Sequence, residues 1–109
     1  MGKVRVREIN NAVYISLDVD FEGLIHNINV KIYKGYVHLE ILPQTGFAEG
    51  VMEVFVRELG TPYDGPRLRV VLSDCGEEPQ ILYASWSFDE DLERIKEKIL
   101  KILSQVEAA

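Results

Sequence analysis

The sequence predicts an α+β domain with two layers, in which an antiparallel sheet carries two helices on one face. The expected element order is ββββαββα, a four-stranded meander plus a hairpin, in a single domain over residues 1–109. Three observations predict this fold: three possible tight turns spaced twelve residues apart, a change from alternating to helical apolar spacing, and a later alternating stretch before an amphipathic C-terminus. A chain of 109 residues with 47% hydrophobic residues can bury a core as one domain.

The possible turns are Asn10-Asn11, Glu22-Gly23 and Lys34-Gly35. Asn and Gly tolerate the positive φ angles that two-residue hairpin turns require. The predicted cross-strand pairs are Val4–Leu17, Val6–Ile15, Glu8–Val13, Leu17–Ile28, Ile15–Val30, Val13–Ile32, Phe21–Leu24, Ile32–Val37, Val30–Leu39 and Ile28–Ile41. All three hairpins place apolar residues on one face, and a slip of one residue in any strand would move its apolar set to the other face. The first 42 residues therefore predict an antiparallel meander.

Two later stretches have helical apolar spacing. The first stripe consists of Phe47, Val51, Phe55 and Leu59, and the second of Leu92, Ile95, Ile99, Ile102 and Val106. Gly60 and Pro62 are typical of the end of a helix. The second helix is expected over residues 89–106, with its start capped by Ser87 together with Glu90, or by Asp89 alone.

Residues 67–88 predict a hairpin between the two helices. The segments "RLRVVLSD" and "QILYASWSF" alternate around the loop "CGEEP". The expected pairs are Leu72–Leu82, Val70–Ala84 and Leu68–Trp86. The position of this hairpin relative to the meander does not follow from the sequence.

Two short motifs have structural explanations. "LPQTG" at residues 42–46 resembles the LPxTG sorting signal of cell-wall proteins, but it lies in the middle of the chain and an amphipathic, acidic stretch follows it. We expect a turn there, with Thr45 as a helix N-cap. "DVDFEG" at residues 18–23 resembles the start of an EF-hand loop, but Asn29 stands where the loop needs a glutamate, and strands flank it.

The candidate catalytic residues do not form a recognisable set. His26 falls on the apolar face, which is typical of a hydrogen-bonded core histidine, and His38 falls on the other face without a recognisable nucleophile. Acidic neighbours of Cys75 disfavour its thiolate. With two histidines and one cysteine, the sequence predicts no metal site, no cofactor and no catalytic residue. It favours a non-enzymatic protein.

Charge and composition limit the partners and the location. The net charge is −6, and because residues 1–41 carry five bases and five acids, the whole excess of acid lies in the second half. An acidic chain is repelled by nucleic-acid phosphates unless one face is basic. No apolar run is long enough for a membrane helix, the N-terminus lacks the apolar part of a secretory signal, and a lone cysteine fits a reducing cytoplasm.

The face of the meander opposite the apolar one suggests two functions. Bases and aromatics on a sheet are one way to hold single-stranded nucleic acid, and the candidates are Arg5, Arg7, Tyr14, Lys31, Tyr33, Tyr36 and His38. If the hairpin of residues 67–88 joins the same sheet, apolar and aromatic residues of both parts face outward, as is typical of a protein interface; the candidates are Ile9, Ile25, Tyr33, Tyr36, Val71, Ile81 and Tyr83.

The element order resembles, at the level of topology only, that of small dimeric chaperones such as secretion chaperones and proteasome-assembly chaperones. We therefore expect a non-enzymatic interaction or assembly module, a homodimer through its open sheet face or a strand edge, with a further unidentified protein partner. Single-stranded nucleic-acid binding is the alternative.

Overall fold

The computed structural model describes residues 3–70, 72–73, 76–77 and 80–108. In these ranges the elements are β1 (Val4–Ile9), β2 (Ala12–Phe21), β3 (Leu24–Tyr33), β4 (Tyr36–Leu42), α1 (Gly46–Leu59), β5 (Asp64–Arg69), β6 (Leu72–Ser73), β7 (Gly76–Glu77), β8 (Ile81–Ser87) and α2 (Leu92–Ala108). Six strands form one antiparallel sheet in the order β1-β2-β3-β4-β8-β5, and β6 and β7 form a separate short ribbon. The predicted α+β fold with the order ββββαββα is confirmed.

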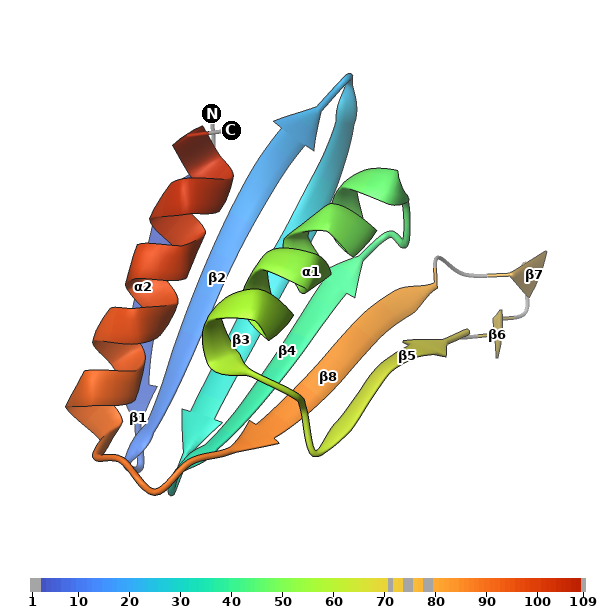
Figure 1. The fold of residues 1–109 in the computed structure, drawn as a ribbon. Helices are drawn as coiled ribbons and strands as arrows, with labels where there is room; N and C mark the ends of the chain where they lie inside the picture. Colours follow the sequence, from blue (N-terminus) through green and yellow to red (C-terminus); the bar gives the residue numbers. More distant parts are fainter. Residues whose placement is uncertain (1–2, 71, 74–75, 78–79, 109) are drawn as a thin grey trace.

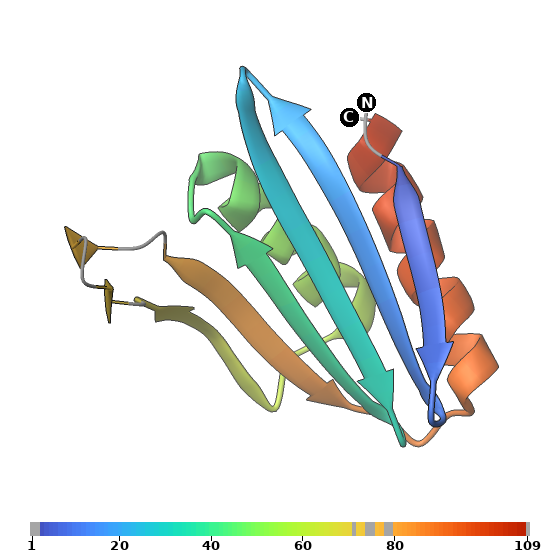
Figure 2. The ribbon, with the colours of Figure 1, turned by 180° about the vertical axis from the view of Figure 1, so that it is seen from behind.

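The sheet and the helices form two layers (Figure 1). Both helices lie on the same face of the sheet, with α2 packed on β2 and β3 and α1 on β4 and β8. Figure 2 shows the opposite face, across which no helix passes in the described part of the chain. We call this uncovered side the open face. Among the described helices, none combines the length and the apolar character needed to span a bilayer.

The meander has the predicted turns and the predicted register. Both central residues of each turn have positive φ, from 48° at Lys34 to 85° at Gly23. Such pairs of angles form tight hairpin turns whose twist matches that of the strands. Every cross-strand pair expected for β1 to β4 is observed.

The core lies between the sheet and the helices, and Trp86 joins its two layers. Its ring is 2% exposed and packs near Phe55 of α1, with ring centroids 6.4 Å apart. Its indole N–H donates a hydrogen bond of 2.8 Å to the carbonyl of Gly60, just after α1. This bond satisfies the one polar group that burial of the indole would otherwise leave unpaired.

The predicted register of the second hairpin is wrong by four residues. Leu68 pairs with Leu82 rather than with Trp86, which instead pairs with Val37 of β4. The strand β5 begins at Asp64, and a bulge between Asp64 and Arg67 shifts its register. The connection to β8 is therefore longer than the loop "CGEEP", and part of it lies outside the described residues.

Two further expectations are corrected. Leu68 and Val70 do not pair with Trp86 and Ala84 as expected, and they are 52% and 46% exposed: Leu68 lies in the edge strand β5, and Val70 follows that strand. The cap of α2 is Asp91, whose Oδ1 accepts a 2.9 Å hydrogen bond from the backbone N–H of Arg94. The helix starts later than expected because the backbone of Phe88 is still bonded to Gly35 at the end of the meander.

Candidate functional site

The open face gathers all five tyrosines of the chain. Tyr14, Tyr33, Tyr36 and Tyr83 point to this side by strand alternation. Tyr63, just before β5, packs edge-on against Tyr36 with ring centroids 5.8 Å apart. The phenylalanines and the tryptophan are absent from this set. The benzene-type rings of the open face therefore all carry a hydroxyl, which can form hydrogen bonds with water while the ring stays apolar.

One end of the open face is basic as well as aromatic. The ammonium of Lys31 lies 5.8 Å from the ring of Tyr14 and 5.9 Å from that of Tyr33, and Lys34 lies 5.3 Å from Tyr33. These distances are typical of cation–π contacts, which hold the ammonium groups beside the rings. Arg7 pairs with Tyr14 from the neighbouring strand β1. The basic end therefore spans β1 to β4.

The other end of the open face, at the β2–β3 hairpin, carries acids and amides. Asp18 accepts a hydrogen bond from Asn27 and forms an ion pair of 3.3 Å with Arg5. Asp20 accepts a bond of 2.9 Å from the backbone N–H of Gly23 and so fixes the turn. Over β1 to β4 the charge of the open face therefore changes sign along the strands, from basic near the Lys34-Gly35 turn to acidic near the Glu22-Gly23 turn, whereas Arg69 of β5 lies level with the acidic end.

A polar network around His38 lies where β4 meets β8 and β5. His38 contacts Ser85 Oγ at 2.8 Å through Nδ1 and Glu40 at 3.0 Å through Nε2. Arg69 donates a hydrogen bond of 2.7 Å to Glu40 and lies 5.7 Å from the ring of Tyr83. Burial raises the pKa of the Glu40 carboxyl, but the hydrogen bonds and charges of His38 and Arg69 outweigh it and hold the pKa below its ordinary value.

Ser85, His38 and Glu40 together have the composition of a hydrolase triad. A nucleophilic serine must reach its substrate, however, and Ser85 is 1% exposed. Its hydroxyl lies beneath the side chains of the open face. The network therefore orients His38 and Glu40 and joins β4 to its neighbours, and we assign it no catalytic role.

The centre of the open face is slightly hollow. A depression of about 260 Å³ is bordered by Tyr14, Ser16, Asn29, Lys31, His38 and Glu40. Its rim thus contains donors, acceptors and one aromatic ring. A depression of this kind can accept a protruding side chain or a base from a partner.

The nucleic-acid candidates named from the sequence all lie on this one face. Arg5 is already paired with Asp18, whereas the side-chain nitrogen of Lys31 lies beside the rings of Tyr14 and Tyr33. The sequence places Glu40 beside His38 on the same strand, but it did not single out Arg69 or Ser85 as neighbours of His38. Only the position of β8 beside β4 and of β5 beside β8 brings them there, and no sequence signal gives that position.

The interface candidates are more dispersed. Tyr33 and Tyr36 pair across their turn, and Ile81 and Tyr83 lie half-buried in β8. Ile9 and Ile25 are 43% and 63% exposed, but they lie at opposite ends of the sheet, beside different turns. Val71 lies outside the described residues. Tyr33 and Tyr36 of the predicted interface are therefore neighbours, whereas Tyr83 lies four residues further along the strands and the two isoleucines lie apart.

Comparison of the chain with protein-family models, with curated proteins and with solved structures gives no match. Within the described residues, no three His, Cys, Asp or Glu side chains are grouped so that they could hold a metal ion. The functional argument therefore rests on the geometry of the open face.

Proposed function

We propose that this protein is a non-enzymatic interaction module, of the assembly or chaperone-like kind, that forms a homodimer through its open face. The observation that carries the proposal is the gathering of all five tyrosines on the side of the sheet that the helices leave uncovered. Tyrosine and arginine are enriched in interfaces and supply much of their binding energy. A cytoplasmic location and a further protein partner belong to the same proposal.

The size of the open face supports this function. The spacing and rise of its six strands give an area of roughly 600–700 Å². A stable interface buries about 800 Å² on each partner. The open face together with the side chains at its rim is therefore large enough for a specific dimer.

The charge pattern of the open face favours a second copy as the partner. A two-fold axis that lies between the two sheets and runs across the strands reverses the strand direction in the second copy. The basic end with Lys31 and Lys34 then faces the acidic end with Asp20 and Glu22. Complementary charges of this kind select the partner and its orientation.

The strand edges are less suited to dimerisation than the face. The edge strand β1 carries Arg5 and Arg7, and β5 contains a bulge. Charged side chains and bulges are two devices that protect sheet edges against pairing with another chain. This comparison favours the open face over the edge in our proposal.

Native mass spectrometry tests the homodimer directly. We expect a species of twice 12.4 kDa for the natural chain and 12.4 kDa for Tyr83→Asp or Ile81→Asp, with the circular dichroism spectrum unchanged. Lys31→Glu should also give the monomer, and the double variant Lys31→Glu/Asp20→Lys should recover dimer because both ends change sign together. Lys101→Glu, on the helical side, is the matched control and should remain dimeric. A natural chain that is monomeric, or open-face variants of unchanged mass, would contradict the proposal.

Single-stranded nucleic-acid binding is the second candidate, and the position of Lys31 between two tyrosine rings favours it. Bases can stack on such rings while the ammonium contacts a phosphate. Fluorescence anisotropy with a labelled oligonucleotide should then show affinity that falls with added salt and is lost in Arg7→Glu and Lys31→Glu. Absence of binding at low salt excludes this candidate.

A further inference from the structure

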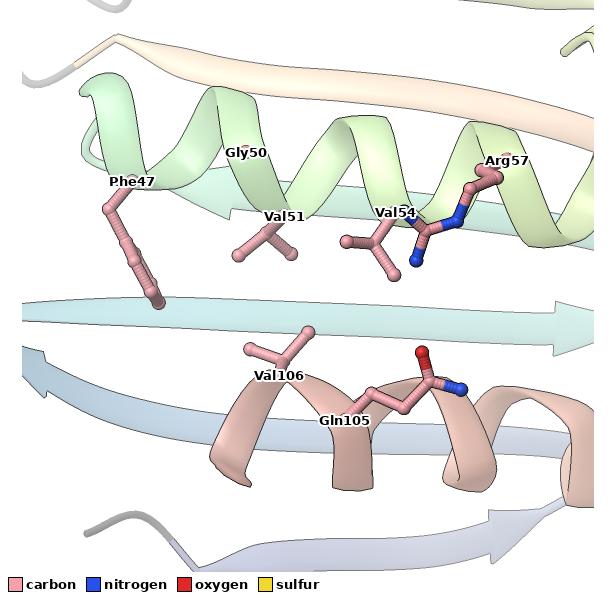
Figure 3. A pocket seen from close by; sticks show the side chains of 7 residues that line it. All are labelled: Phe47, Gly50, Val51, Val54, Arg57, Gln105 and Val106. Carbon is pink, nitrogen blue, oxygen red and sulfur yellow. The ribbon is translucent and has the colours of Figure 1, made fainter. Parts of the chain in front are cut away.

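The helical side of the molecule contains a groove that lies on the opposite side of the sheet from the open face. It has a volume of about 310 Å³ and runs between α1 and α2 (Figure 3). Phe47, Val51 and Val54 point into it from α1, and Val106 points into it from α2. The walls of the groove are therefore apolar along most of its length.

One end of the groove is polar. Figure 3 shows the guanidinium of Arg57 and the carboxamide of Gln105 directed into the space between the helices from its two sides. Within the described residues, Arg57 forms an ion pair with Glu58 in which Nε of Arg57 lies 3.9 Å from Oε2 of Glu58. That distance is too long for a hydrogen bond. The planar fork of the guanidinium thus remains able to bind an anion.

Gly50 borders the groove on the side of α1. It lies inside α1, where glycine is among the least favourable residues. An added Cβ would meet no atom within 4 Å, so packing inside the chain does not require a glycine here. Because Gly50 lines the groove, a larger side chain at this position would occupy the space between the helices.

We propose that this groove binds an amphiphile with one medium-length alkyl chain and a single carboxylate, that is, a medium-chain fatty acid. Its apolar chain lies along Phe47, Val51 and Val106, and its carboxylate accepts hydrogen bonds from Arg57 and Gln105. The volume of 310 Å³ lies at the lower end of the range of about 300–1,000 Å³ for small-molecule sites. One unbranched chain therefore fits, whereas a large cofactor does not.

The charges near the groove favour one negative charge on the ligand rather than several. Besides Arg57, α1 carries Glu49, Glu53 and Glu58. These carboxylates repel a phosphate or a dicarboxylate more strongly than a single carboxylate. The site is independent of the proposed dimer function because it lies on the other layer.

Isothermal titration calorimetry with octanoate tests the proposal. We expect octanoate to bind, octanol to bind about tenfold more weakly, and octylamine and acetate to bind more weakly still, because each lacks the carboxylate or the chain. Arg57→Gln should weaken octanoate binding about tenfold and leave octanol binding unchanged. Gly50→Leu should abolish binding of both. Arg94→Gln, an exposed arginine of α2 outside the groove, is the matched control and should bind octanoate normally.

Three results overturn the proposal. Octanoate can fail to bind at millimolar concentration, or it can bind no better than octanol and octylamine, which would make the groove an unselective apolar surface. Gly50→Leu can also change the mass of the assembly while octanoate has no effect, which would assign the groove to a second protein chain. Because Arg57 is largely exposed, Arg57→Gln keeps the test valid if Gly50→Leu does not fold.

Discussion

At the scale of single residues, a chain of hydrogen bonds joins the sheet to α1. The ring of His26 is buried, with Nδ1 3.2 Å from the carbonyl of Leu24 and Nε2 2.6 Å from Thr45 Oγ1. The same Oγ1 accepts a 3.2 Å bond from the N–H of Ala48 in the first turn of α1. In the neutral tautomer with the proton on Nδ1, every one of these groups has a partner. Thr45 is therefore both the predicted N-cap and the partner of the buried histidine.

Replacement of Thr45 by alanine should lower the free energy of unfolding by about 1–2 kcal/mol, because it removes the helix cap and leaves Nε2 of His26 without a donor. Thr45→Ser retains the hydroxyl and should recover most of the loss. Urea denaturation followed by the fluorescence of Trp86, the only tryptophan, measures both. Equal stability of Thr45→Ala and the natural chain would contradict this role.

Glu40 gives the fold a defined dependence on pH. Its pKa lies below the ordinary value of 4.5 because His38 and Arg69 stabilise the carboxylate more than burial opposes it. A carboxyl with a lowered pKa in the folded chain stabilises the fold above its ordinary pKa, and this contribution is lost as the pH falls through the lowered value. We therefore expect Glu40→Gln to be less stable than the natural chain at pH 7, with the difference shrinking below pH 4.5.

The control for this pH dependence is Glu93→Gln, at an exposed position in the first turn of α2. Its stability should run parallel to that of the natural chain through the same acid range, apart from the small dipole term of a helix start. A difference between Glu40→Gln and the natural chain that does not change with pH would show that the network of His38 and Arg69 has no electrostatic effect on the fold.

At the scale of secondary structure elements, the bulge of β5 depends on Gly65. Its φ is 95°, and a Cβ there would lie 2.7 Å from the carbonyl oxygen of Tyr83 in β8. Gly65→Ala should therefore lower the free energy of unfolding by about 2 kcal/mol, from backbone strain and steric conflict together. Gly46→Ala is the matched control, because a Cβ at the start of α1 meets no atom within 4 Å. Urea denaturation should show no loss of stability in Gly46→Ala.

The same elements show how far the sequence determines the fold. In the meander, each of the three tight turns gives a register for the two strands that it joins. All three registers agree with the apolar alternation. In the hairpin of residues 67–88, the alternation was the only constraint, and an even shift of register keeps the same side chains on the same face. The pairing of Leu68 with Leu82 instead of Trp86 is an even shift of this kind, and it contradicts nothing in the apolar pattern. The start of α2 was ambiguous in a similar way, since Ser87 and Asp89 were the expected caps and Asp91, which caps the helix, is equally suited by residue type.

The candidate sites were predictable to different degrees. The meander alone brings Arg7, Tyr14, Lys31 and His38 together, so the register prediction was sufficient for that half of the open face. Arg69 and Ser85 join it only because β8 lies beside β4, a long-range pairing that the local pattern does not encode. The groove between the helices was missed because the distance between two helices depends on the whole packing of the sheet beneath them.

At the scale of the whole molecule, the sheet separates the two proposed sites. The open face and the groove lie on opposite sides of it, so a substitution at one should not affect the other. Tyr83→Asp should bind octanoate as the natural chain does, although it is monomeric. Arg57→Gln should remain a dimer in native mass spectrometry, although it binds octanoate weakly. Loss of both functions in either variant would show that the two sites are coupled through the sheet.

The tight turns of the meander also determine the order in which the chain folds. The strands β1 to β4 pair with their neighbours in sequence. The second partner of β4 is β8, which follows α1 and β5 in the chain, so this pairing closes a much longer loop. Contacts that close short loops form sooner than contacts that close long ones. Pulse-labelled hydrogen exchange should find the amides of β2 and β3 protected before those of β8. During synthesis, the meander can then form before the later residues leave the ribosome, and Trp86 and the buried side chains of α2 join the core after it.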